Sequence, residues 1–203
     1  MSRLGLAVLS MMFVIFFALS YGFSLTGNSS FYWTSVLVGI LTIPSAAAFN
    51  GKELMQDFSL SIFYFITLLS ALVVLTFFIS IIDYRWGSTI PLIFITPVIV
   101  EEFNFRYLLQ RVFLKKFSPY IAIFLQAVLY SLYYARYAIA AGGVAYPVPY
   151  NIVLVTSMFG MGLVYGILAK FSKNFFLPAT VHLILWSLFP WLPAAIASTI
   201  LPA

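Results

Sequence analysis

The chain has 203 residues, of which 64% are hydrophobic and 7% are charged, and it contains no cysteine. This composition excludes disulfide bonds and thiolate metal sites, and the formal charge of +5 does not indicate nucleic-acid binding, because basic residues in so apolar a chain mainly report membrane topology. A helix needs about 20 apolar residues to cross a bilayer, and such runs follow one another along nearly the whole sequence. We therefore predict an all-α fold, a polytopic transmembrane helical bundle of seven or eight spans with no soluble domain. The predicted spans are 4–25, 31–49, 58–82, 90–114, 120–141, 151–169 and 175–189.

The first and last apolar segments need separate treatment. Residues 4–25 follow Arg3 and contain ALS, which resembles a signal-peptide cleavage site. The run is longer than the roughly 7 to 15 apolar residues of a signal peptide, so we predict a retained first helix. The apolar tail 191–203 is too short to predict a span and is compatible with a re-entrant or tilted piece. We treat 1–203 as a single integral membrane domain.

The basic residues predict the orientation of the bundle. With seven spans, seven basic residues fall on one side and two on the other, which by the positive-inside rule places the N-terminus in the cytoplasm. The larger group is Arg3, Lys52, Arg111, Lys115, Lys116, Lys170 and Lys173, and the smaller group is Arg85 and Arg136. Arg136 is either a boundary residue on the far side or, if its helix continues to residue 141, a second counter-charge for the glutamates described next.

Glu101, Glu102 and Arg106 interrupt the apolar run 90–114 in the stretch EEFNFR. At about 1.5 Å per residue, Glu101 lies about 21 Å from the end of its helix at Lys115, which places the three side chains inside the membrane. An ionised side chain at that depth costs at least about 2.5 kcal/mol, so such residues normally face the bundle interior and mark function. Glu102 and Arg106 stand at i and i+4 and can neutralise each other, which is the structural alternative. That pair leaves Glu101 without a partner on its own helix, and we therefore favour a functional site.

Two neighbouring carboxylates beside one guanidinium have a chemical consequence. The arginine holds one carboxylate ionised, while poor solvation and like-charge repulsion favour a proton on the other. A carboxylate poised in this way can take a proton from water and return it to a leaving group, or it can carry a proton in a transport cycle. Pro91 and Pro97 precede the pair and are expected to break or kink the helix, either opening a polar cavity or bending a packed helix.

The only histidine of the chain, His182, lies in another apolar segment, LPATVHLILWSLF. A lone buried histidine is ordinarily bonded to a backbone carbonyl. In a chain with an intramembrane glutamate pair, we instead expect His182 to share a site with Glu101 and Glu102. The depths, about 12 Å from the helix end for His182 and about 21 Å for Glu101, agree only if the histidine helix is tilted or starts late.

The stretch EEFNFR resembles the E-E-x-x-x-R motif of the CPBP family of intramembrane proteases, which includes CAAX-processing enzymes and bacteriocin-immunity proteins. Phe105 before Arg106 fits the common E-E-x-x-F-R form. The later segment GMGLVYGILAKFSKNFFLPATVHLILW is similar to the family's third region, in which a Gly-rich helix and a polar turn precede a helix with a histidine. The resemblance covers about residues 90–190 and implies the family's helical membrane core.

Two positions depart from the family's pattern. In the second motif, F-x-x-x-H, Tyr130 stands for the phenylalanine and Tyr134 for the histidine, and a placement with Tyr133 supplies no histidine either. In the third motif, H-x-x-x-N, Trp186 stands for the asparagine. Tyrosine donates a hydrogen bond but is a poor base, and an indole N–H cannot accept. Because losing one supporting group can cost about 10²- to 10³-fold in rate, an inactive protein stays an alternative.

The resemblance also implies roles for individual residues. It makes Glu101 the base that activates a water, Glu102 and Arg106 the residues that shape its charge, and His182 a donor to the oxyanion; Tyr134 donates in place of the second-motif histidine. We expect no metal and no other cofactor. Zinc requires about three protein ligands in suitable geometry, while adjacent glutamates point about 100° apart on a helix and the H-E-x-x-H pattern is absent.

Three functions are compatible with these residues. The first is an intramembrane endopeptidase that cuts a membrane-embedded or lipidated peptide near the cytoplasmic leaflet. The second is an inactive family member that binds a partner subunit as a scaffold or accessory protein. The third is a proton-linked transporter, against which the lack of an internal repeat argues. We favour the first, with the lipid bilayer as a partner in every case and nucleic acid in none.

Overall fold

The computed structural model describes residues 3–139 and 148–188, and within these ranges every regular element is helical. The all-α prediction is therefore confirmed. The predicted tail 191–203 lies outside the described residues. The elements are α1 (Arg3–Thr26), α2 (Ser29–Leu60), α3 (Ile62–Ile82), α4 (Tyr84–Gly87), α5 (Ile90–Ile93), η1 (Phe94–Ile99), α6 (Val100–Glu102), η2 (Phe103–Leu109), α7 (Gln110–Leu114), α8 (Pro119–Ala135), η3 (Arg136–Ile139), α9 (Val148–Ser172) and α10 (Phe176–Leu188).

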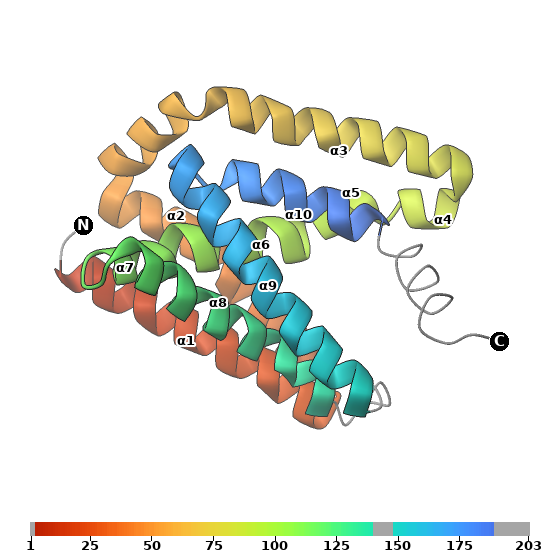
Figure 1. Ribbon diagram of the computed structural model, residues 1–203, viewed down its shortest axis with the longest axis horizontal. Coiled ribbons are helices and arrows are strands. Elements are labelled where there is room, and N and C mark those ends of the chain that lie inside the picture. Colours follow the sequence, from red (N-terminus) through yellow and green to blue (C-terminus); the bar gives the residue numbers. More distant parts are fainter. Residues whose placement is uncertain (1–2, 140–147, 189–203) are drawn as a thin grey trace.

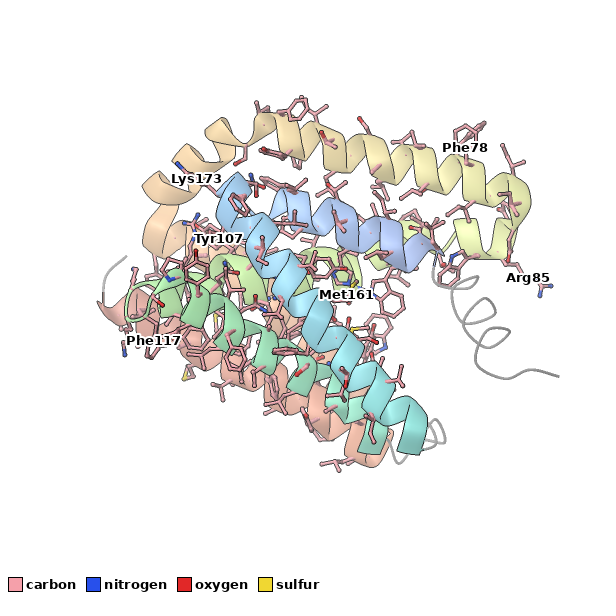
Figure 2. The ribbon with its side chains drawn as sticks, in the orientation of Figure 1. Phe78, Arg85, Tyr107, Phe117, Met161 and Lys173 are labelled. Atoms are coloured by element: carbon pink, nitrogen blue, oxygen red, sulfur yellow. The ribbon has the colours of Figure 1, made fainter. Side chains whose placement is uncertain are left out.

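Among the described residues, four helices are long and apolar enough to cross a bilayer, and the protein is an integral membrane protein. The four segments are Leu4–Thr26, Ser29–Phe49, Ile62–Ile82 and Ile152–Ser172, and α8 and α10 are apolar but shorter. The outward faces fit a lipid environment. On α3 only Leu68 and Ile79 are buried, and Figure 2 shows Phe78 projecting away from the bundle. Apolar side chains on an outward face are stabilised by lipid rather than by other helices.

The second span ends as predicted, whereas the third begins at Ile62 and not at residue 58. The α2 helix continues to Leu60 and α3 begins at Ile62, so the polar stretch GKELMQDF is helical rather than a loop. This stretch contains Lys, Glu, Leu, Met and Gln, which are good helix formers, so a helix can extend beyond the apolar segment. The predicted span 120–141 also differs, because its α-helix ends at Ala135 and continues as the 3₁₀ turn η3. Residues 140, 141 and 189 of the predicted spans lie outside the described residues.

The helices pack as three pairs around a broken central helix. The pairs are α1 with α2, α8 with α9, and α3 with α10, and Figure 1 shows α3 and α10 side by side along the top of the view. The central helix consists of α5, η1, α6, η2 and α7, and it contacts members of all three pairs. The glutamates lie on this helix, so the bundle holds them away from lipid.

Glycines bring two helices close to their neighbours. A Cβ added at Gly39 of α2 would lie 2.5 Å from Val100 Cγ1, just before the glutamates, and one added at Gly162 of α9 would lie 2.9 Å from Ala127 Cα of α8. Small residues permit such close approach between membrane helices, where packing rather than the hydrophobic effect drives association. The pair α8 and α9 therefore depends on glycine at this position.

We expect the substitution Gly162→Ala to destabilise the protein. The new methyl would also lie 3.0 Å from Ala127 Cβ, so the two helices must separate, and overpacking of this kind costs about 1–3 kcal/mol. Gly160→Ala is the matched control on the same helix, because its Cβ would meet nothing within 4 Å. Unfolding in mixed detergent micelles measures both variants. Equal stability of the two would contradict the close-packing explanation.

Candidate active site

The central helix breaks just before the glutamate pair. Thr96 has extended backbone angles, φ −138° and ψ 118°, and the helix resumes at Pro97. Proline disfavours a helical conformation in the residue before it and supplies no N–H to the preceding turn. The predicted break is therefore confirmed at Pro97, whereas Pro91 lies in the first turn of α5, where proline is compatible with a helix.

The resumed helix departs from regular α geometry around the site. The segment η2 is π-helical, and the N–H of Gln110 bonds to the carbonyl of Phe105. Such wider turns occur mostly as short insertions in α-helices and frequently at functional sites. Here η2 contains Arg106 and follows directly after Glu102, so the wider turn lies within the site itself.

Glu102 is held in a buried charged network. Its Oε2 lies 3.1 Å from Nε of Arg106, and its Oε1 lies 2.9 Å from Nδ1 of His182. The side chains of all three residues are buried. The predicted i, i+4 pair is therefore present, and His182 joins it from α10. Glu102 has one partner for each carboxylate oxygen and is committed to this network.

Two tyrosines pack against Arg106 and His182 of the network. The Arg106 guanidinium carbon lies 4.5 Å from the ring centre of Tyr130 and 5.3 Å from that of Tyr165, which are cation–π distances. The His182 ring stacks on Tyr165 with centroids 5.1 Å apart. The two rings shield Arg106 and fix the plane of the imidazole, so the network is rigid as well as buried.

Glu101 has different surroundings. The Tyr134 hydroxyl donates a hydrogen bond of 2.8 Å to its Oε2. Glu101 also lines a cavity of about 210 Å³, large enough for several water molecules. The cavity lining comprises Phe16, Ser20, Phe23, Tyr32, Ser35, Val36, Thr96, Pro97, Val100, Glu101, Tyr133, Tyr134, Arg136, Tyr137 and Trp186. Among the described lining residues Glu101 is the only acidic one, so Glu101 and not Glu102 meets the space where a reactant could lie.

The five residues predicted for the site come together, but in an unexpected division. Tyr134 contacts Glu101, whereas His182 and Arg106 contact Glu102. The alternative placement of the second motif on Tyr133 is not supported, because that ring lies under a guanidinium instead of beside a glutamate. The site therefore has two parts, a cavity with Glu101 and a closed network around Glu102.

Arg136 has a place in the site that the sequence left open. Its side chain is 5% exposed and lines the same cavity as Glu101. Its guanidinium carbon lies 3.7 Å from the ring centre of Tyr133, Nη2 donates a 2.9 Å hydrogen bond to the hydroxyl of Tyr137, and Nη1 has no hydrogen-bond partner among the described residues. It is therefore a buried cation on the cavity wall.

Sequence reasoning missed Tyr165. It lies in the segment GMGLVYG, where the family resemblance rests on the glycines and not on the tyrosine. Its position four residues after Met161 and four before Ala169 on an apolar helix gives no local signal of a polar partner. Only the packing of α9 against the central helix shows that it contacts His182 and Arg106.

The described acidic and imidazole side chains do not gather as the ligands of a metal ion would. Within residues 3–139 and 148–188, no three side chains of His, Asp or Glu gather in a way that could hold an ion. Glu102 is occupied by Arg106 and His182, which leaves Glu101 as a single carboxylate toward the cavity. This donor set falls short of the three protein ligands of a catalytic zinc site.

Comparison with known proteins identifies the family of the chain. Residues 86–189 match the family described as type II CAAX prenyl endopeptidase Rce1-like. The match includes the broken helix, Tyr134, Arg136, His182 and Trp186, and it covers just over half of the chain. No curated protein and no solved structure matches the chain. The chain belongs to the Rce1-like family of type II CAAX prenyl endopeptidases, and so to the CPBP intramembrane proteases.

Proposed function

We propose that this protein is an intramembrane endopeptidase that hydrolyses a membrane-associated peptide with a water activated by Glu101. The observation that supports the proposal is the difference between the contacts of Glu101 and those of Glu102. Each carboxylate oxygen of Glu102 contacts Arg106 or His182, whereas Glu101 accepts a hydrogen bond from Tyr134 among the described residues and faces a cavity with room for water and a peptide backbone.

In the proposed reaction, the Glu101 carboxylate takes a proton from a water molecule as its oxygen attacks the carbonyl carbon of the scissile peptide bond. The resulting tetrahedral oxyanion needs hydrogen-bond donors or positive charge. Then the C–N bond breaks, and Glu101 returns the proton to the departing amine. The products are a free carboxyl group and a free amino group, and Glu101 ends the cycle as the carboxylate with which it began.

The donors for the oxyanion are assigned from the cavity lining. Tyr134 and Arg136 both line the cavity with Glu101, and Arg136 has one nitrogen without a hydrogen bond. His182 is not part of the lining, and its Nδ1 contacts Glu102. We therefore assign His182 to positioning Glu102, in place of the oxyanion role that the family resemblance implies. We assign the oxyanion to Arg136, because the single O–H of Tyr134 already donates to Glu101.

Cleavage of a peptide library by the full chain in liposomes tests the function. Mass spectrometry of the products should show new amino and carboxyl termini, and the same liposomes should show no proton flux. A folded protein that cuts nothing, under conditions in which a family member with both histidines is active, would favour the scaffold alternative. Proton flux without cleavage would favour transport.

We expect Tyr134→Phe to lower the cleavage rate. The substitution removes the hydroxyl that donates 2.8 Å to Glu101 and leaves the ring. A hydrogen bond to a charged group is worth about 1.5–3 kcal/mol, so the expected loss is about ten- to a hundred-fold. Tyr120→Phe is the matched control, because Tyr120 lies on the same helix, is exposed and does not line the cavity. An equal loss in both variants would argue against a specific role for Tyr134.

A further inference from the structure

The lining of the cavity comes from one end of the bundle. The α1 helix contributes residues between 16 and 23, shortly before it ends at Thr26, and α2 contributes residues between 32 and 36, shortly after it begins at Ser29. The contribution of α8 and η3 is residues 133–137, around the end of α8 at Ala135. Thus the cavity lies near the turn between α1 and α2.

The basic turns lie at the other end. Lys115 and Lys116 precede α8, whose 17 residues separate them from Arg136 by about 25 Å. In Figure 1 the N-terminal end of α1 and the turn between α7 and α8 lie at the left, whereas α1 and α8 end at the lower right. Figure 2 likewise places Phe117 and Lys173 on the left and Arg85 at the far right.

The exposure of the lining residues places the mouth of the cavity. Phe23, Tyr32 and Tyr137 are half-buried, whereas Ser20 and the charged groups deeper in the cavity are buried. The other half-buried lining residues are Thr96, Pro97 and Trp186. Thr96 and Pro97 lie where the central helix resumes, about 28 Å along that helix from its basic end, so they too are far from the basic turns.

We propose that the cavity opens to the membrane face opposite the N-terminus and the Lys115–Lys116 turn. With the basic turns in the cytoplasm, this face is extracytoplasmic. The substrate class is then a peptide segment presented on that side, with its apolar side chains against Phe16, Phe23 and Tyr32 and its polar backbone toward Glu101 and Arg136. Cleavage of the segment rests on the proposed function, whereas access to the cavity does not. The site of action differs from the cytoplasmic leaflet expected from the sequence.

The absence of cysteine from the chain makes access directly measurable. Single-cysteine variants of the full chain in right-side-out vesicles are treated with a small, negatively charged methanethiosulfonate that does not cross membranes. A fluorescent maleimide applied after denaturation then reports the thiols that remain. Ser20→Cys probes the cavity, Ser30→Cys marks the exposed turn after α1, and Ser118→Cys marks the exposed turn before α8. Ser187→Cys is the buried control that does not line the cavity.

In sealed vesicles, Ser20→Cys and Ser30→Cys should both lose the later maleimide signal. Ser118→Cys should lose it only after permeabilisation, and Ser187→Cys should keep it throughout. Three results would overturn the proposal: Ser20→Cys reacting only after permeabilisation, Ser20→Cys not reacting although Ser30→Cys does, or the two marker positions exchanging sides. External reaction of Ser20→Cys without cleavage of an externally added peptide would support the access and count against the proposed protease.

Discussion

Replacing Glu101 by glutamine should abolish most peptide cleavage while leaving the protein folded. The amide has nearly the same shape and can still accept the hydrogen bond from Tyr134, but it cannot take a proton from water. General-base catalysis typically contributes about 10²- to 10⁴-fold, and we expect the rate to fall by that factor. The measurement is kcat in liposomes with a cleaved peptide identified from the library.

Two controls make this result specific to the chemistry. In mixed detergent micelles, the variant should unfold at the same concentration of denaturing detergent as the wild type. The reason is that glutamine keeps the size and the contacts of the Glu101 side chain. Its loss should appear in kcat and not in KM, because a proton acceptor acts in the transition state. Wild-type rates in Glu101→Gln would show that another group activates the water.

Arg106→Met should be the most destabilising single change in the site. It leaves the Glu102 carboxylate buried with only His182 as a partner, and it removes the cation that Tyr130 and Tyr165 surround. Removing one partner of a buried ion pair costs about 3–5 kcal/mol, because the remaining charge is uncompensated. Reversible unfolding in mixed micelles measures the difference in the free energy of unfolding.

The double variant Glu102→Gln/Arg106→Met distinguishes loss of charge balance from loss of packing. With both charges removed, we expect much of the stability to return, since a neutral pair of similar volume is often tolerated. Lys116→Met is the control for losing one cation at an exposed position, where changes are usually within about 0.5 kcal/mol. Equal stability of Arg106→Met and Lys116→Met would show that the network does not stabilise the fold.

The sequence predicted those parts of the site that depend on local rules. The pairing of Glu102 with Arg106 follows from helical spacing, and the break at Pro97 follows from the chemistry of proline. The helical class and most spans follow from runs of apolar residues. The extension of α2 to Leu60 was missed because hydropathy marks the membrane segment and not the end of the helix.

The rest depended on how separate helices meet. Counting residues from the helix ends placed His182 and Glu101 at different depths, which did not tell which glutamate the imidazole would reach. The structure pairs the imidazole with Glu102. The reason is the packing of α10, which contacts α3, α9 and the glutamate segment α6. The same is true of Arg136, whose burial depends on the rings of neighbouring tyrosines and not on its own segment.

The division of labour between the two glutamates affects what a sequence motif can reveal about activity. A descendant that gave up catalysis would still have to fold, so selection would keep Glu102, Arg106 and His182, which hold three helical segments together. Only Glu101 would be released to drift. Under the proposed function, the second and last positions of E-E-x-x-x-R therefore report ancestry, whereas Glu101 and Tyr134 report whether this protein cuts.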